Sequence, residues 1–356
     1  FYNDGSRPHR MIHDEEAEKA LPPQEGQGLP GSEVTVAEVL KARGYHTVHI
    51  GKWHLGEGPE FGPNAQGFDE SLLMASGMYL PEKDPGVVNA KQRFDPIDRF
   101  IWARMTHAAN FNGGPLFSPR GYLTDYYTEE AEKVIKANKN RPFFLYLAHW
   151  GVHSPLQATR ADYDALPQIK DHRLRVYAAM VRALDRSVGR VMRTLRDEGL
   201  ADNTVVIFTS DNGGAGYLGL PDVNKPYRGW KLTFFEGGIR VPYFVSWPGK
   251  IAPGARLEDP VSHIDLLPTV AAAAGTAPPS DRPIDGVNLM PYLTGGPRPA
   301  APPHEAIFWQ DGHYLAVLKD GWKLQTSGDP KKDWLFNVAV DPTEQRNLAA
   351  SNPQKV

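Results

Sequence analysis

A loop at residues 51–56 places a cation and a proton carrier close together. Lys52 and His54 lie two residues apart between Gly51 and Gly56, so both side chains can approach one small ligand. A flexible ammonium group suits a tetrahedral oxyanion, and an imidazole titrates near neutral pH. In isolation, a Lys-x-His sequence is more often a solvated lysine and a histidine that caps a backbone carbonyl. The chemical interpretation therefore depends on the groups that accompany these two.

A second polar loop, Asp211-Asn212-Gly213-Gly214, follows an apolar stretch directly and offers two hard oxygen ligands. Carboxylate and amide oxygens are ligands that Ca²⁺ or Mg²⁺ accepts. The same four residues also make an ordinary turn, and both interpretations stay open from these residues alone. Two ligands do not make a tight metal site, so further carboxylates must come from elsewhere.

Two histidines and one lysine complete the set of candidates. His149 and His153 follow the apolar stretch 143–148, and their spacing does not say which of them is structural. Lys231 lies in the glycine-rich and aromatic stretch 227–240, although a single lysine is usually a surface residue.

Three segments that each run helix, strand, loop are expected to position these residues. The first helix opens with Thr35 and Glu38 at capping-box spacing. Apolar strands that alternate with helices indicate a mostly parallel sheet covered by helices on both sides. Ligands bind beyond the carboxyl ends of the strands in such sheets. The candidate residues in the polar loops all follow the predicted strands, which cover residues 45–50, 143–148 and 204–209.

The last part of the chain differs in composition. Residues 275–303 are rich in Pro, Gly and Ala, which favours a connecting segment. Asp320-Gly321 is a strong two-residue hairpin signal between short strand-like pieces. We therefore expect a catalytic domain over 1–275, a connection over 276–303 and a small antiparallel subdomain over 304–356. Its predicted strands cover residues 306–310, 314–319, 322–325 and 334–337.

Composition excludes several functional classes. Of the 356 residues, 41% are apolar and 23% are charged, and the net charge of −3 gives no basis for a nucleic-acid or anionic-membrane partner. No uninterrupted apolar run is long enough to span a bilayer. The absence of cysteine excludes disulfides, thiolate metal sites and cysteine nucleophiles among these residues.

Taken together, the motifs resemble those of the sulfatase family over nearly the whole chain. The resemblance implies an alkaline-phosphatase-like α/β fold, in which helices sandwich a mostly parallel sheet beside a small C-terminal antiparallel subdomain. It also implies Ca²⁺, with Mg²⁺ as an alternative, and a formylglycine nucleophile that a formylglycine-generating enzyme makes from Cys or Ser. The blocks that carry the resemblance are 44–54, 209–214, 231–242, 246–249, 263–269, 284–289 and 341–348.

Motif positions imply a role for each candidate. Lys52, His153 and Lys231 would contact the sulfate and the leaving oxygen, with His153 as a candidate general acid. His54 would hydrogen-bond the hydrated aldehyde and assist its later elimination of sulfate. The pair Asp211-Asn212 would form half of a Ca²⁺ site. The substrate would be a sulfated small molecule or glycan, and the resemblance favours a periplasmic or secreted location.

The family's first signature, C/S-x-P-x-R, is the point of departure. Ser6-Arg7-Pro8-His9-Arg10 matches it formally, but Arg and His stand where the family has small residues. Ser118-Pro119-Arg120 has the wrong spacing. We expect the nucleophile to precede Phe1, and this chain by itself to hydrolyse no sulfate ester at a useful rate.

Two other functions compete with this interpretation. One is a phosphate-ester or phosphonate hydrolase of the same superfamily, because the anion-binding chemistry is similar. The other is an inactive protein that binds sulfated glycans, although a pure binder would not need a proton carrier at His54. The enzyme interpretation requires the six candidate residues to converge on one pocket that holds a tetrahedral anion.

Overall fold

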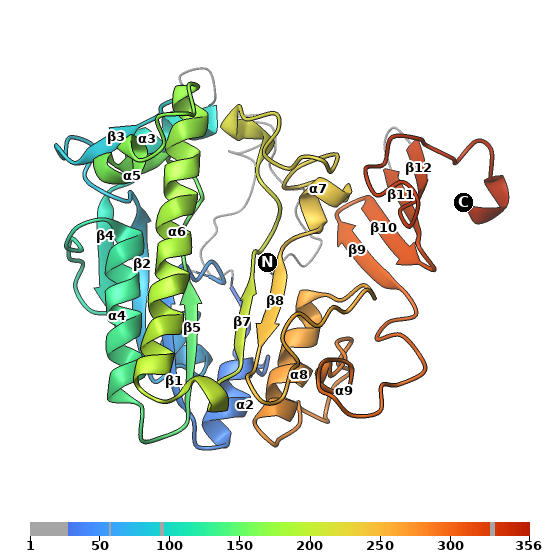
Figure 1. Cartoon of the computed structure of the whole chain (residues 1–356), viewed down its shortest axis with the longest axis horizontal. Helices are drawn as coiled ribbons and strands as arrows, with labels where there is room; N and C mark the ends of the chain where they lie inside the picture. Colours follow the sequence, from blue (N-terminus) through green and yellow to red (C-terminus); the bar gives the residue numbers. More distant parts are fainter. Residues whose placement is uncertain (1–27, 57, 93–95, 328–331) are drawn as a thin grey trace. The chain divides into compact units, whose positions relative to one another are not determined.

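The computed structural model describes residues 28–56, 58–92, 96–327 and 332–356, and these fall into two compact units (Figure 1). The first unit contains described residues up to 204 together with 270–282. The second contains 205–269 together with 283–356. The domain boundaries expected at 275 and 303 stay a prediction.

A four-stranded sheet with the order β4-β2-β1-β5 forms the centre of the first unit. β1 (His46–Gly51) pairs in parallel with β2 (Glu70–Gly77) on one side and with β5 (Phe143–Ala148) on the other. β4 (His107–Phe111) closes the sheet antiparallel to β2. Because β1 and β5 run in the same direction and end opposite each other, the loops that follow them leave the sheet at one edge.

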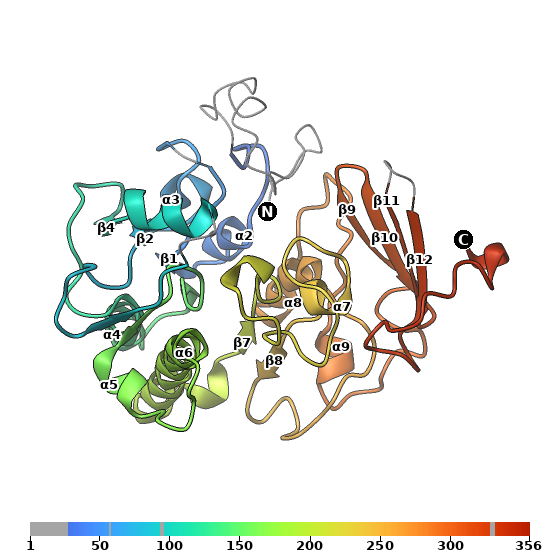
Figure 2. The same ribbon diagram turned by 90° about the horizontal axis from the view of Figure 1, so that it is seen from above.

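Helices cover both faces of this sheet. α4 (Leu123–Ala137) and α6 (His172–Asp197) lie on one side and α2 (Val36–Ala42) on the other (Figure 2). α2 begins with the capping box predicted from Thr35 and Glu38, in which each side chain bonds the other residue's backbone N–H. The unit also contains η1 (Pro63–Gln66), β3 (Val87–Asn89), α3 (Pro96–Arg104), β6 (Gln157–Thr159), α5 (Arg160–Asp164) and η2 (Ala201–Asn203).

The core of the first unit lies between the sheet and these helices. On the α4 side, Leu123, Tyr127 and Ala131 are fully buried, and on the α6 side Val176 and Ala179 are equally inaccessible. These positions recur at three- and four-residue intervals, which is the spacing of one helical face. α4 and α6 therefore each bury one face, as the predicted alternation of helices and strands requires.

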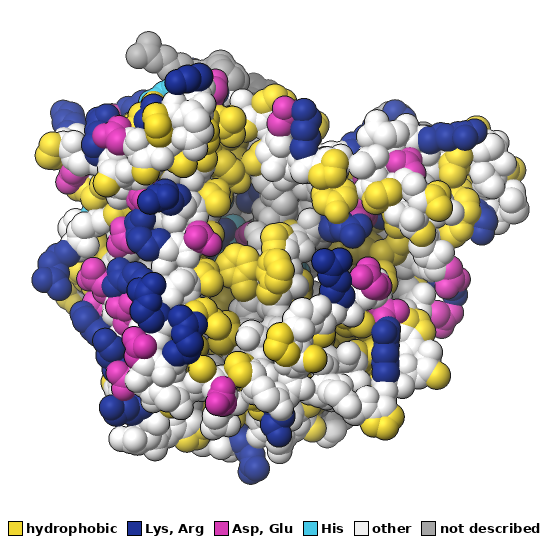
Figure 3. All heavy atoms as spheres, in the orientation of Figure 1, with side chains coloured by type: hydrophobic (Ala, Val, Ile, Leu, Met, Phe, Trp, Pro, Cys, Tyr) yellow, Lys and Arg dark blue, Asp and Glu magenta, His cyan; other side chains and the backbone are white. Residues whose placement is uncertain are grey.

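The outer face of α6 carries arginines whose charge is largely neutralised. Arg186 bonds the carboxylates of both Asp125 and Asp162, and Arg190 bonds Glu132 through two nitrogens. Figure 3 accordingly shows Lys and Arg interspersed with Asp and Glu over this part of the surface. The face is mixed in charge, so it offers no concentrated positive field to a polyanion.

The second unit contains the third predicted strand. β7 (Val206–Thr209) pairs antiparallel with β8 (Tyr243–Ser246), whereas both neighbours of β1 run parallel to β1. α7 (Glu236–Ile239) lies shortly before β8. The unit also contains η3 (Gly216–Leu218), η4 (His263–Asp265), α9 (Met290–Leu293) and η5 (Pro353–Lys355), while α8 (Leu266–Ala273) crosses the boundary between the units.

An antiparallel sheet with the order β12-β11-β10-β9 forms the C-terminal part of the second unit. Asp320 and Gly321, with φ of 51° and 75°, make the tight turn between β10 and β11 that the sequence predicts. Its strands are β9 (Ile307–Asp311), β10 (Tyr314–Lys319), β11 (Trp322–Ser327) and β12 (Lys332–Asn337). The prediction of an α/β fold with a parallel-rich sheet and a C-terminal antiparallel sheet is confirmed.

Candidate active site

The parallel pairing of β1 with β5 positions the Lys52 loop. Gly51 is the last residue of β1 and lies opposite Ala148, and the backbone N–H of Lys52 donates to the Ala148 carbonyl at 2.8 Å. A Cβ atom at Gly51 would lie 2.0 Å from that same carbonyl oxygen, and its φ is 114°. Only glycine fits this close approach. Lys52 therefore begins its loop directly beside the end of β5.

The indole of Trp150 joins two of the predicted residues. Lys52 Nζ lies 5.0 Å from the centroid of the Trp150 ring, and the imidazole of His153 stacks on the indole at 3.9 Å between centroids. Trp150 itself is 7% exposed, and its Nε1 donates to the Gly77 carbonyl at the end of β2 at 2.9 Å. Lys52 and His153 thus contact one rigidly held ring. Trp150 was not among the residues predicted from the sequence.

The backbone and ring of His153 are held separately. Nδ1 donates to the Ser154 carbonyl at 2.7 Å, which places a proton on that nitrogen. The hydroxyl of Tyr79 donates to the His153 carbonyl at 2.9 Å, and Tyr79 is fully buried against Tyr122. This imidazole is half-buried and oriented, as a group that moves a proton at a defined atom must be.

His149 lies in a different environment from His153. Its Nε2 is 2.8 Å from the Ser187 hydroxyl on α6, and burial lowers its pKa to about 4. The residue is half-buried, and a histidine that stays neutral is a structural residue, not a proton carrier at neutral pH. This environment favours His153 over His149 as the chemically active histidine.

His54 is exposed in the loop after β1. Its φ of 62° lies in the left-handed region, which a residue with a Cβ atom adopts at some cost in energy. Buried His49 supports the start of the same loop, because its Nε2 donates to the Lys52 carbonyl at 3.0 Å. Burial lowers the pKa of His49 to about 4, so this support is a neutral imidazole.

In the second unit, the Asp211 loop packs backbone against backbone on α7. The N–H of Gly213 donates to the Gly238 carbonyl at 2.9 Å, and a Cβ atom at Gly213 would lie 1.8 Å from the Gly237 carbonyl oxygen. A Cβ atom at Gly238 would in turn meet the Thr233 carbonyl at 2.2 Å. The glycines of both motifs are therefore required by this contact.

Lys231 lies beside the Asp211 loop as a result. Its N–H donates to the Gly214 carbonyl at 3.1 Å, and burial lowers the pKa of its ammonium while the Asp211 charge opposes that shift. The amide of Asn224 bonds both the N–H and the carbonyl of Gly214 and also the Gly229 carbonyl, at 2.7 to 3.0 Å. Asn224, another residue missed by sequence reasoning, connects the two loops.

The residues at the end of β7 fit part of a divalent-cation site. The Asn212 amide nitrogen donates to the Gly213 carbonyl at 2.9 Å, which orients the amide and leaves its oxygen as the atom with ligand chemistry. Asp211 is exposed and adds a carboxylate. Among the described residues, no group of three or more His, Asp or Glu side chains is close enough to hold a metal. Asp211 and Asn212 would thus be two ligands of a larger set.

The six predicted residues fall equally between the units. Lys52, His54 and His153 lie in the first unit, and Asp211, Asn212 and Lys231 lie in the second. Their convergence on one anion stays a prediction.

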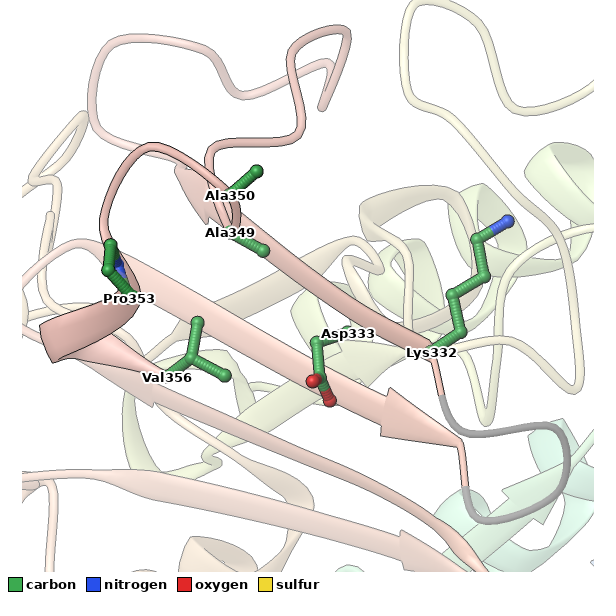
Figure 4. A pocket seen from close by; sticks show the side chains of 6 residues that line it. All are labelled: Lys332, Asp333, Ala349, Ala350, Pro353 and Val356. Carbon is green, nitrogen blue, oxygen red and sulfur yellow. The ribbon is translucent and has the colours of Figure 1, made fainter.

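A separate hollow on the C-terminal sheet contains none of the six residues. It is lined by Lys332, Asp333, Ala349, Ala350, Pro353 and Val356 (Figure 4). No helix in the described ranges is long and apolar enough to cross a membrane. The formal match at Ser6 to Arg10 lies outside the described residues.

Sequence comparison identifies one family. A model of the sulfatase family matches residues 5–276. The N-acetylgalactosamine-6-sulfatase of Canis lupus familiaris is 36% identical over 311 residues, covering 86% of this chain and 56% of the relative. The steryl-sulfatase of Rattus norvegicus is 32% identical over 378 residues, covering 88% and 63%. The chain thus spans little more than half the length of these curated relatives.

Structural comparison agrees with the sequence comparison. The crystal structure of Ps i-CgsB in complex with k-i-k-neocarrahexaose has a TM-score of 0.78 and 30% identity, covering 94% of this chain and 74% of that one. A phosphonate monoester hydrolase from Silicibacter pomeroyi, SpPMH, has a TM-score of 0.65 at 17% identity, covering 92% and 78%. At that identity, the second likeness shows a shared fold alone.

Proposed function

Because the chain belongs to the sulfatase family, we propose that its residues serve the hydrolysis of sulfate esters to an alcohol and sulfate, together with a formylglycine nucleophile that they do not include. The observation that carries the proposal is the contact of Lys52 and His153 with the single indole of Trp150. A cation for the sulfate oxygens and a proton carrier for the leaving oxygen are the two groups that this cleavage needs. An inert anion-binding loop would not require an oriented imidazole beside its lysine.

Hydrolysis breaks the bond between sulfur and the ester oxygen. That oxygen leaves with negative charge, and His153 would deliver a proton to it, which is a contribution of about 10²–10⁴-fold in rate. A formylglycine hydrate, which the family resemblance implies, would supply the attacking hydroxyl. His54 would accept and return a proton beside that group. Overall, ester and water give alcohol and sulfate.

Two lysines would supply the positive charge that stabilises the sulfate. Lys52 and Lys231 would each stabilise a sulfuryl oxygen by up to about 4 kcal/mol at contact in a near-surface dielectric. Lys231 suits this role because burial has already stripped part of its hydration, as the lowering of its pKa indicates. Asp211 and Asn212 would hold a Ca²⁺ or Mg²⁺ ion, and such an ion, when bound, would further neutralise the anion.

We propose a sulfated sugar as the substrate class. Two relatives support this choice: one is named N-acetylgalactosamine-6-sulfatase, and the other was crystallised with k-i-k-neocarrahexaose. A periplasmic or secreted location, where such glycans are encountered, belongs to the same proposal, and fractionation of the producing cells would test it.

The test is turnover by a protein that contains both this chain and the family's C/S-x-P-x-R motif, co-produced with a formylglycine-generating enzyme. The chain by itself should release no sulfate at a useful rate. We expect sulfate release from an aryl sulfate and from N-acetylgalactosamine 6-sulfate, with slower hydrolysis of the matching phosphate and phosphonate esters. His153→Gln should lower the rate by about 10²–10⁴-fold, whereas His149→Gln, a matched control four residues away, should lower it far less.

Two results would replace the proposal. Faster hydrolysis of the phosphate or phosphonate ester would support the competing superfamily activity. No turnover, together with binding of a sulfated glycan that His54→Ala leaves unchanged, would support the inactive binder.

A further inference from the structure

A lysine is completely buried in the C-terminal sheet. Lys323 in β11 has no exposed surface, and its Nζ bonds Glu236 Oε1 and Glu344 Oε1, each at 2.7 Å. Lysine is almost never fully buried unless its charge is paired. Because Glu236 is the first residue of α7, this ammonium joins the C-terminal sheet to the helix that follows the Lys231 loop.

The two carboxylates have further partners. Glu236 N–H donates to Glu344 Oε2 at 2.6 Å, and Gln325 Nε2 donates to Glu344 Oε1 at 3.4 Å. Arg240 Nη1 lies 3.3 Å from Glu236 Oε2, and Arg228 Nη1 donates to the Glu344 carbonyl at 3.2 Å. Three cationic and two anionic side chains therefore meet in this cluster, with Lys323 at its centre.

Such a cluster is poorly explained by stability alone. A buried ion pair is often no more stabilising than well-packed apolar side chains of the same volume, because desolvation offsets the attraction. The cluster does hold its members in fixed relative positions, because the hydrogen bonds of its oxygens and N–H groups are satisfied together in one arrangement. The location of the cluster indicates which geometry is fixed.

Backbone contacts lead from the cluster to the candidate site. Gly237, the next residue after Glu236, donates its N–H to the Arg228 carbonyl at 2.7 Å and so closes the loop that contains Lys231. Gly238 follows and accepts the Gly213 N–H. A displacement of Glu236 would therefore move both the Lys231 loop and the Asp211 loop, because neither glycine contact has room to adjust.

We propose that Lys323, with Glu236 and Glu344, is a positioning cluster through which the C-terminal sheet sets the place of Lys231 beside Asp211. The inference rests on the proposed function, in which Lys231 binds the sulfate. Lys323 touches no reacting atom in this proposal, and acts through the loop.

A double-mutant cycle tests the proposal. Lys323→Met leaves two buried carboxylates facing each other, and Lys323→Met combined with Glu344→Gln removes that repulsion if the first variant fails to fold. Misplacement of a binding group by an ångström costs about 10²-fold, so we expect kcat/KM for an aryl sulfate to fall by about that factor. In a Lys231→Ala background the same cluster change should cost less, because the ammonium that it positions is already gone and the displacement of the Asp211 loop alone remains.

Hydrogen exchange supplies a readout that needs no turnover. In the cluster variants, amides of 211–214 and 228–238 should lose protection. Leu335→Ala is the matched control, because Leu335 is 1% exposed on the neighbouring strand β12 and pairs with Leu324, not with Lys323. It should destabilise the same sheet while leaving both protection of these amides and kcat/KM near their parent values.

The outcomes separate the two proposals. Equal losses of kcat/KM with and without Lys231, or unchanged protection in folded cluster variants, would overturn the positioning role. If the protein releases no sulfate, the proposed function fails, and the exchange data still decide whether the cluster holds the two loops.

Discussion

Replacement of Trp150 by leucine should weaken the binding of sulfate, because the indole contacts two of the side chains proposed to bind it. The indole contacts the Lys52 ammonium at 5.0 Å and stacks on the His153 ring at 3.9 Å. A cation–π contact contributes about 0.5–2 kcal/mol, and an aromatic pair contributes about 0.5–1.5 kcal/mol beyond its buried area. Without the indole, sulfate must order both side chains itself. At 1.4 kcal/mol per factor of ten, sulfate affinity should fall by about 5- to 300-fold.

The change also has a cost in stability that must be measured separately. Trp150→Leu leaves the Gly77 carbonyl without its indole donor, which costs about 1–3 kcal/mol in a buried site. We would determine the inhibition constant of inorganic sulfate against an aryl sulfate, and the free energy of unfolding by chemical denaturation. Trp150→Phe should give a smaller loss of affinity, because it keeps a ring beneath both groups.

Trp102→Leu is the matched control for this prediction. Trp102 on α3 also has a lysine over its ring, Lys91 at 4.6 Å, and its Nε1 also donates a hydrogen bond, to Asp98. Its replacement removes the same kinds of contact without touching a candidate residue. If folded Trp150→Leu protein binds sulfate within twofold of the parent, or if the control loses affinity equally, the reasoning about the indole is wrong.

Three further predictions follow from the site. His149→Phe should retain most of the rate that His153→Gln loses, because His149 bonds Ser187 on α6 and stays neutral. Steady-state kinetics of the two variants would show equal losses if this assignment is wrong. Burial holds the pKa of His49 and His149 at about 4, below the usual 6.5, so the unfolded chain binds more protons between those values. The contribution of these two residues to the free energy of unfolding should thus be greatest above about pH 6.5 and fall as pH drops towards 4. Equal denaturation midpoints at pH 7 and pH 5 would contradict this. Ca²⁺ should raise the melting temperature of the parent protein but not that of the Asp211→Ala, Asn212→Ala double variant, and an equal rise in both would place the ion elsewhere.

Local features were predictable because their causes are close in sequence. The capping box of α2 needs only Thr35 and Glu38 at the right spacing, and the turn at Asp320-Gly321 needs only residues that tolerate positive φ. The polar loop after β1 was equally predictable, because ligands bind at the carboxyl edge of a parallel sheet.

The features that sequence reasoning missed depend on contacts between distant residues. In the sequence, Trp150 is one more apolar residue after β5. Its role is visible only in the fold, where the ends of β1 and β2 place Lys52 and Gly77 beside its ring. Lys323 reads as a solvated strand residue, because nothing nearby in the sequence reveals Glu236, 87 positions away. The ambiguity between two histidines had the same origin, since Ser187 lies 38 residues from His149.

The contact between Gly213 and Gly237 has a consequence for how relatives of this protein can diverge. The contact joins main chain to main chain, so it does not depend on the side chains of the surrounding residues. A residue larger than glycine does not fit at Gly213. Surrounding loops can therefore accumulate substitutions while the spacing between the Asp211 and Lys231 loops is inherited unchanged. Under the proposed function, changes in substrate preference would then be separated from changes in the groups that bind sulfate.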